Sequence, residues 1–385
     1  MIRSIALSIA LLGVPLAQAQ KTNPTTLEIG SKAPGFKLKN VDGKVVALSD
    51  YADHEAVVVI FTCNHCPDAR AARGRIKQLH ADFKDKGVAV ITISGNAAEA
   101  VRFDELGWSV YGDSFEEGVI VAREEGYEFP YLFDGDTQEV TAAYGARATP
   151  HAFVLDRDRV VRYTGRLDDM KRKPGKPERS YIHEAVEAVL AGKSPDPAVT
   201  RAIGCSIKWK SKGDQVAVVN AAWKALPERL EKMDVAEAKK LRQNQSGNLR
   251  LINFWSTSCA PCVAEFPMLV ETYRRYQTRP FDLVTISLDP TEKSADVEKF
   301  LGKMQVSLSR HTKESLKVEG RQSNNYIFSG RNPDPLAEAI DPEWSGAMPY
   351  TVLLSGEGEI VWRHEGELDA ITLRKAIIKE LDKSL

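Results

Sequence analysis

Two cysteine pairs carry the chemistry that this sequence can perform. Cys63 and Cys66 stand three residues apart after an apolar run, and Cys259 and Cys262 repeat that spacing almost two hundred residues later. The chain has five cysteines in 385 residues, which is too few for a small disulfide-stapled scaffold. Each pair could hold a metal, staple a loop, reduce peroxide or exchange disulfides.

The same order of elements surrounds both pairs. Residues 56–61 and 251–255 read as buried strands that end at the cysteines, and apolar residues at helical spacing follow each pair. A second apolar strand comes next, at residues 88–93 and 283–286. Strand–helix–strand units imply parallel pairing, so each copy is predicted to be an α/β domain.

A proline-started hairpin completes each copy. Pro150 follows Cys66 by 84 residues and Pro349 follows Cys262 by 87, and such near-equal spacing indicates an internal repeat. The predicted hairpin strands and final helices are residues 151–155, 160–164 and 182–190 in the first copy, and 351–354, 360–363 and 371–381 in the second. Between the copies, residues 191–197 read as a helix stop and linker, and residues 226–241 as a charged helix.

A strand that ends in Cys-x-x-Cys and opens a helix suits disulfide exchange. The first cysteine is expected at the helix N-terminus, where free N–H groups and the helix dipole favour a thiolate. The second cysteine, one turn further on, can then resolve a mixed disulfide with a partner.

This arrangement resembles the thioredoxin fold, here twice in tandem. The resemblance implies that Cys63 and Cys259 are nucleophiles and that Cys66 and Cys262 are resolving cysteines. It also implies that Pro150 and Pro349 are cis-prolines facing the cysteines.

Each copy resembles a different branch of that fold. Residues 253–262 (NFWSTSCAPC), with Glu265-Phe-Pro267, are similar to the TlpA and ResA reductases. Residues 29–34 (IGSKAP), 63–67 (CNHCP), 129–132 (FPYL) and 204–209 (GCSIKW) resemble the peroxiredoxin-like redoxin (AhpC/TSA) group. The predicted domains are a signal peptide (1–19), a redoxin domain (25–198), a linker (199–213) and a TlpA/ResA-like domain (214–385).

Other uses of the cysteines are weighed against this one. A zinc site shared by all four cysteines would have to bring the two pairs together. Each pair follows its own strand and has its own hairpin, so such a site would disrupt both folds. A permanent staple gains little stability from so short a loop. Copper held by Cys63, Cys66 and either His65 or His151 stays an alternative, because thiolate and imidazole both suit copper.

A thiol peroxidase in the first domain, reduced by the second domain, is the sharper alternative. Peroxiredoxins place a threonine three residues before the reactive cysteine and a proline four residues before that threonine. Counting back gives Ile60 and Ala56 from Cys63, and Cys63 and Val59 from Cys66, so neither register matches.

The two copies differ in their titratable neighbours. Thioredoxin's buried Asp is replaced by Val57 and Asn253, whereas Glu265 resembles the acid of the ResA-like pattern and is a candidate base. Ala69 takes the corresponding place in the first copy, so no acid is expected there. His65, between the first two cysteines as in DsbA-like enzymes, predicts a more oxidising couple. Electrons are then expected to run from the second domain to the first, directly or through a partner.

Cys205 stands outside both pairs. Its setting, after a glycine and before Ser-Ile-Lys-Trp, suits a small buried hydrophobe. The alternative is a third thiol that relays with the first pair.

The N-terminus and the composition indicate where the protein works. Arg3, an apolar stretch at residues 5–16 and Ala17-Gln-Ala19 predict a signal peptide cut after Ala19, so we expect export to a periplasm. A net charge of −1 gives no basic or acidic excess, and neither nucleic acid nor stable membrane insertion is expected.

The expected activity is thiol:disulfide exchange with cysteines of envelope proteins, recharged by a periplasmic or membrane-bound thiol reductant. It needs no cofactor, because the disulfide itself carries the two electrons. The inserts at residues 96–147 and 305–347 are expected to shape partner choice.

Overall fold

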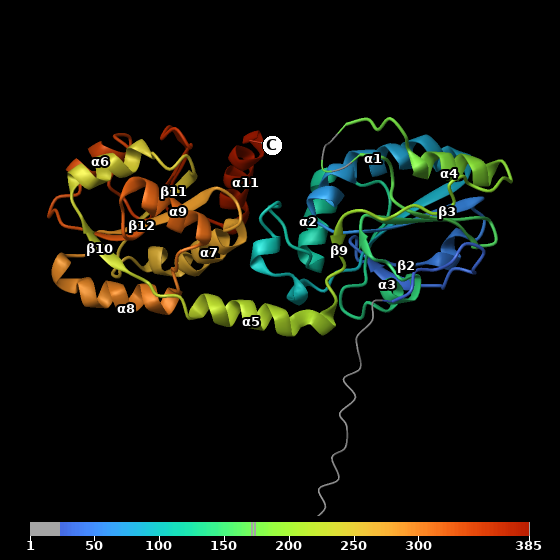
Figure 1. The fold of residues 1–385 in the computed structure, drawn as a ribbon, viewed down its shortest axis with the longest axis horizontal. Coiled ribbons are helices and arrows are strands. Elements are labelled where there is room, and N and C mark those ends of the chain that lie inside the picture. Colours follow the sequence, from blue (N-terminus) through green and yellow to red (C-terminus); the bar gives the residue numbers. More distant parts are fainter. Residues whose placement is uncertain (1–23, 171, 173–174, 385) are drawn as a thin grey trace, which may run out of the picture.

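The computed structural model describes residues 24–170, 172 and 175–384, so the predicted signal peptide lies outside the described residues. Figure 1 shows two α/β domains with helix α5 (Gly213–Lys224) running between them. Among the residues described, no helix is both long enough and apolar enough to cross a membrane.

The first domain is built on a mixed seven-stranded sheet in the order β2-β1-β5-β4-β3-β7-β8. β3 and β4 are parallel, β5 continues parallel to β4, and β7 and β8 form the predicted antiparallel hairpin. The strands are β1 (Lys37–Asn40), β2 (Val45–Ala47), β3 (Ala56–Thr62), β4 (Val88–Ser94), β5 (Tyr131–Phe133), β7 (His151–Leu155) and β8 (Val161–Gly165). The α-helices are α1 (Pro67–Phe83), α2 (Phe115–Glu125), α3 (Glu139–Tyr144) and α4 (Tyr181–Leu190).

Strand β3 is fully buried because both of its faces are covered. Val58 and Ile60 pack with α1 and α4 on one face, whereas Val59 and Phe61 pack with α3 on the other. Alternation along a strand divides an all-apolar run between two cores in this way. The strand therefore delivers the cysteines to the edge of a rigid layer.

The second domain repeats this plan with a six-stranded sheet in the order β10-β13-β12-β11-β14-β15. Its central strand β11 is parallel to β12 and antiparallel to β14. The strands are β10 (Leu230–Met233), β11 (Leu249–Trp255), β12 (Phe281–Ser287), β13 (Asn325–Phe328), β14 (Tyr350–Leu354) and β15 (Ile360–Glu365). The α-helices are α6 (Val235–Gln243), α7 (Ala260–Tyr276), α8 (Ser294–Met304), α9 (Arg310–Glu319), α10 (Asp334–Ile340) and α11 (Ala370–Leu381). The topology of both domains is that of the thioredoxin fold.

The region between the copies differs from the prediction. Within the expected linker 199–213, β9 (Cys205–Ser206) pairs with β6 (Ala148–Thr149), and Ile207 is buried in the first domain's core. The helix expected at 226–241 is interrupted by β10, because its half-buried residues pair in parallel with β13. Helix α5, which the sequence analysis did not predict, has one buried side chain, Trp223.

A loop of the first domain docks on the second. The carbonyl oxygens of Gly107, Ser109 and Val110 accept hydrogen bonds from Arg279, Tyr276 and Arg275 at 3.1, 3.2 and 3.2 Å. The loop belongs to the predicted insert 96–147, so this part of that insert contacts the chain's own second domain.

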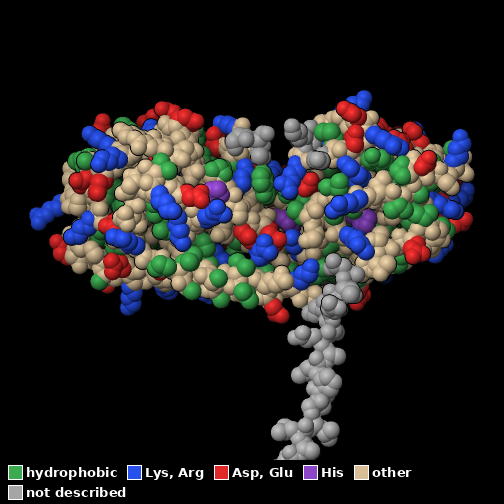
Figure 2. Space-filling view, viewed as in Figure 1, with side chains coloured by type: hydrophobic (Ala, Val, Ile, Leu, Met, Phe, Trp, Pro, Cys, Tyr) green, Lys and Arg blue, Asp and Glu red, His purple; other side chains and the backbone are tan. Residues whose placement is uncertain are grey.

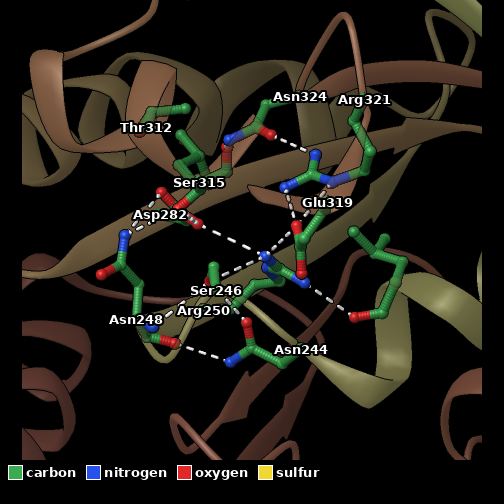
Figure 3. Close-up of polar contacts among 12 residues, drawn as sticks. Asn244, Ser246, Asn248, Arg250, Asp282, Thr312, Ser315, Glu319, Arg321 and Asn324 are labelled. Atoms are coloured by element: carbon green, nitrogen blue, oxygen red, sulfur yellow. Dashed lines mark hydrogen bonds and ion pairs between the residues drawn. The ribbon is translucent and has the colours of Figure 1, made fainter. Parts of the chain in front are cut away.

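A buried polar cluster lies at the end of the second sheet that is away from the cysteines. Arg250, fully buried, forms ion pairs with Asp282 at 3.4 Å and Glu319 at 2.7 Å, as Figure 3 shows. Arg250 and Asp282 are register partners near the start of β11 and β12, at the end of these strands away from the cysteines. The cluster is therefore structural, since it joins α9 to the sheet.

Acidic and basic side chains are interspersed over the face drawn in Figure 2. This distribution accords with the net charge of −1.

Candidate functional site: two dithiols in different settings

The second domain presents a half-exposed cysteine at a helix start. Cys259 is the N-cap of α7 and is disulfide-bonded to the fully buried Cys262, with a Cα–Cα distance of 5.3 Å. The backbone N–H of Cys262 points at the Cys259 sulfur over 3.3 Å. Backbone N–H groups and the helix dipole favour a thiolate at this position. Cys259 is thus the sulfur of the pair that a partner can reach.

Glu265 follows one turn after Cys262 and is buried, with 6% of its surface exposed. It accepts hydrogen bonds from the Asn253 amide at 3.1 Å and the Leu368 backbone N–H at 3.3 Å. Burial raises the pKa of Glu265 to about 7, against the lowering effect of the Asn253 hydrogen bond. A carboxyl group with this pKa can take up and release a proton near neutral pH.

The prolines lie where the resemblance implies. The Thr149–Pro150 and Met348–Pro349 peptide bonds are both cis. In the first domain, the residue before the proline touches both thiols, because Thr149 Oγ1 is 3.2 Å from the Cys63 sulfur and Thr149 O is 3.1 Å from that of Cys66. In the second domain, Met348 packs against the same apolar cluster as Cys259.

The first-domain pair is more enclosed. Cys63 is 2% exposed and Cys66 is fully buried, and both are free thiols. Here the second cysteine, Cys66, is the N-cap of the helix. The expected helix position of the first cysteine is therefore right for Cys259 and wrong for Cys63.

Proline placement explains this difference. Proline is favoured in the first turn of a helix, where its missing N–H costs nothing. Pro67 follows Cys66 and is the first residue of α1, so this helix starts after the pair. Pro261 lies between Cys259 and Cys262 as the second residue of α7, so that helix starts inside the pair.

The two thiols of the first site differ in acidity. Thiol hydrogen bonds from Cys205 and Cys63, backed by backbone N–H groups of Ala69 and Cys205, hold the pKa of Cys66 far below its usual range. Burial and the hydrogen bond to Cys66 raise the pKa of Cys63. Cys66, at the helix terminus, is thus the more acidic thiol of this pair.

An acid does stand beside this pair, contrary to the expectation drawn from Ala69. Asp68 Oδ2 lies 4.0 Å from the Cys66 sulfur and pairs with Arg172 at 3.4 Å. Burial and the neighbouring Cys66 raise the pKa of Asp68. Asp68 does not stand at the position equivalent to Glu265, because the helix starts later here than in the second copy.

His65 lies in a buried polar network. Its Nδ1 is 2.6 Å from Asp113 Oδ2, and the same carboxylate accepts from the backbone N–H groups of Asn64 and His65 and from the Asn96 amide. Burial lowers the pKa of His65, but the Asp113 carboxylate outweighs this effect and raises it. Asp113 therefore favours the protonated form of His65, beside the thiols. Nothing in the sequence marks Asp113, because it comes from the long insert.

His151 is occupied by structural contacts. Its Nδ1 accepts the Arg147 backbone N–H at 3.2 Å and its Nε2 lies 3.0 Å from Thr164 Oγ1. Burial lowers the pKa of His151 to about 4, so the ring is neutral. Two sets of side chains have potential metal-ligand atoms that lie within 4.8 Å of one another inside each set. One set is Cys63, His65 and Asp113, and the other is Cys66, Asp68 and Cys205.

Cys205 is only partly buried and packs against Cys63 and Cys66. The prediction that it is a small buried hydrophobic residue is therefore not met. Its backbone N–H points at the Cys66 sulfur over 3.3 Å. Strand β9 brings it there from outside the predicted redoxin domain.

Comparisons with known proteins agree with this division. The AhpC/TSA family model matches residues 29–164 and the Redoxin family model matches residues 224–377. A putative peroxiredoxin of Mycobacterium tuberculosis is 27% identical over 155 residues, covering 36% of this chain and 98% of its own. The thiol-disulfide oxidoreductase ResA of Bacillus thuringiensis is 24% identical over 147 residues, covering 38% and 75%.

Among solved structures, a conserved protein of Geobacillus kaustophilus is 41% identical over 48% of this chain and 93% of its own, with a TM-score of 0.43. A protein of Sinorhizobium meliloti is 34% identical over 50% and 100%, with a TM-score of 0.44. The chain thus carries two redoxin-type domains in tandem, the first matched by the AhpC/TSA family and the second by the Redoxin family, and it is similar to thiol-disulfide oxidoreductases of the ResA kind.

Proposed function

We propose that this protein is an exported thiol:disulfide oxidoreductase whose two dithiols exchange disulfides with cysteines of envelope proteins. The observation that carries the proposal is the second-domain site. Cys259 is half-exposed at a helix start, Cys262 is fully buried behind it, and Glu265 with a pKa of about 7 lies one turn on.

The reductive direction follows from these positions. The Cys259 thiolate attacks one sulfur of a partner's disulfide and releases the other as a thiol. Glu265 accepts the proton of Cys262, and the Cys262 thiolate then attacks the Cys259 sulfur. This step frees the reduced partner and leaves the Cys259–Cys262 disulfide, which a periplasmic or membrane-bound thiol reductant returns to the dithiol.

The first domain supplies a second, more oxidising couple. The His65 imidazolium stabilises the thiolate of the reduced Cys63/Cys66 pair, which makes its disulfide a stronger oxidant. Electrons then run from the second domain to the first. Because Cys259 stands at the end of α7 opposite the domain contact, this transfer takes place through a partner protein or after the domains separate.

Thiol peroxidase activity in the first domain is the second candidate. It is favoured by the lowered pKa of the Cys66 thiol at the α1 N-cap and by the AhpC/TSA match. The reactive sulfur in that case is Cys66.

Turnover of two substrates by four variants separates these functions. Insulin disulfide reduction and hydrogen peroxide consumption are measured for the wild type and for Cys63→Ser, Cys66→Ser, Cys259→Ser and Cys262→Ser. We expect Cys259→Ser to lose at least tenfold in insulin reduction. Peroxide turnover that only Cys66→Ser abolishes, with insulin reduction absent in the wild type, would overturn the first proposal in favour of the second.

A further inference from the structure

Cys205 is built into the first dithiol site by backbone pairing. Strand β9 is antiparallel to β6, so that Cys205 is the register partner of Thr149, the residue before Pro150. The same Thr149 touches both Cys63 and Cys66, and the Cys205 N–H points at the Cys66 sulfur over 3.3 Å. The third cysteine therefore stands beside the reactive pair.

Gly204 permits this close approach. It has φ +146°, and a Cβ there would lie 2.0 Å from the Thr149 carbonyl oxygen. A side chain at this position would push β9 away from β6. The glycine before Cys205 thus keeps the third thiol at the pair.

Contacts that follow Cys205 fix the strand in place. Ile207 is buried in the core, with 1% of its surface exposed. The Lys208 N–H donates to Asn96 Oδ1 at 2.9 Å, and its carbonyl oxygen accepts from Ala97 N–H at 3.0 Å and from the Gln138 amide at 2.9 Å. Such anchoring holds Cys205 in position rather than leaving it on a free connection between domains.

We propose that Cys205 is a third catalytic cysteine, which takes over the disulfide of the first domain from Cys63 by forming a Cys66–Cys205 bond. The proposal rests on the proposed function in that Cys63 and Cys66 form a disulfide when they reduce a partner's disulfide. The Cys205 thiolate attacks the Cys66 sulfur, the Cys66–Cys205 bond forms, and the Cys63–Cys66 bond breaks with Cys63 as the leaving thiolate. No electrons leave the domain, so the exchange needs no further oxidant.

Asp68 is placed to accept the proton of this step. Its carboxylate and the sulfurs of Cys66 and Cys205 all lie within 4.8 Å of one another. Asp68 takes the proton of the Cys205 thiol, and the released Cys63 thiolate is protonated in turn. The Cys66 and Cys205 sulfurs lie within 4.8 Å of each other and must approach to about 2 Å to form the bond.

After this exchange the first domain holds a Cys66–Cys205 disulfide, and Cys205 is its more exposed cysteine. Cys63 and Cys66 are enclosed, whereas Cys205 is partly exposed. β9 also occupies the backbone edge of β6 that an incoming strand would need. A reductant would therefore meet the first-domain disulfide at Cys205.

Disulfide mapping of the full-length chain tests this inference. Cys63→Ser protein is treated with excess oxidised glutathione, alkylated, digested and analysed by mass spectrometry. We expect a Cys66–Cys205 linkage in most molecules, and loss of that linkage in Cys63→Ser/Cys205→Ala. The neighbouring exposed substitution Ser206→Ala, added to Cys63→Ser, is expected to leave it intact.

Persistence of a glutathione adduct on Cys66, or free thiols at both Cys66 and Cys205, would overturn the inference. A parallel map of the unsubstituted protein guards against misfolding of the variant, and the absence of any Cys66–Cys205 peptide there would also overturn it. Cys205→Ala reports separately on the proposed function. A Cys63–Cys66 disulfide in that variant upholds the dithiol even if the third cysteine is inert.

Discussion

The Tyr276 hydroxyl donates a hydrogen bond to the Ser109 carbonyl oxygen over 3.2 Å, joining the last turn of α7 to a loop of the first domain. Cys259 caps the opposite end of this 17-residue helix, about 25 Å away at 1.5 Å per residue. The second domain thus docks through the end of α7 that carries no cysteine. Cys259, at the other end of the helix, lies outside these α7 contacts.

Removing Arg279 should loosen this docking. The guanidinium is 4% exposed, donates to Gly107 O at 3.1 Å and Leu381 O at 2.8 Å, and lies 4.0 Å from the centre of the Trp108 ring. We expect Arg279→Ala to destabilise the domain contact by about 2–4 kcal/mol and to separate the thermal unfolding into two transitions in calorimetry.

Arg310→Ala is the matched control, because that side chain is 90% exposed and its ion pair with Glu314 lies on the surface. It should leave the unfolding profile unchanged. A single, unshifted transition in Arg279→Ala would contradict the docking role assigned to this residue.

Glu265 should make the stability of the second domain depend on pH. Its pKa is about 7 in the folded protein, against an ordinary value of 4.5, so between these values the folded state holds a proton that the unfolded chain has lost. Stability therefore falls as pH rises from about 4.5 to about 7, by at most about 3 kcal/mol. Urea unfolding across this range should show the fall in the wild type and a flatter profile in Glu265→Gln.

Glu298→Gln, an exposed substitution on α8, should keep the wild-type profile. A Glu265→Gln profile that also keeps it would show that this carboxyl group titrates normally.

The sequence predicts the frame of the protein better than the details of its sites. Apolar runs were enough to place the central strands and hairpins. The strand predicted at residues 56–61, for example, differs from β3 (Ala56–Thr62) by one residue. Spacing alone could not show that Pro67 delays the helix start, which moves the N-cap from Cys63 to Cys66. Nor could it show that Asp113 and Cys205 reach the first pair, because both contacts depend on how distant segments fold back over the sheet.

His65 should raise the reduction potential of the first couple. Replacing it by Ala removes the ring whose protonated form stabilises a thiolate of the pair, and so destabilises the reduced form. We expect the potential of Cys63/Cys66 to fall by about 30 mV, the equivalent of about 1.4 kcal/mol, in equilibration with glutathione. The Cys259/Cys262 couple of the same molecule serves as the internal reference and should not shift.

His151→Asn is the second control, because the His151 ring is buried but neutral. It should leave the potential of the first couple in place. A rise in that potential in His65→Ala, or an equal fall in both variants, would contradict the role given to the imidazolium.

The central claim is that Cys259 attacks a partner's disulfide and that Cys262 resolves the product. Trapping with Cys262→Ser tests it most directly, with reduced variant mixed with insulin and the products resolved by non-reducing mass spectrometry. The account predicts a covalent adduct of one insulin chain on Cys259, absent in the wild type and in Cys259→Ser/Cys262→Ser. An adduct on Cys63 or Cys205 instead, or none in Cys262→Ser, would contradict it.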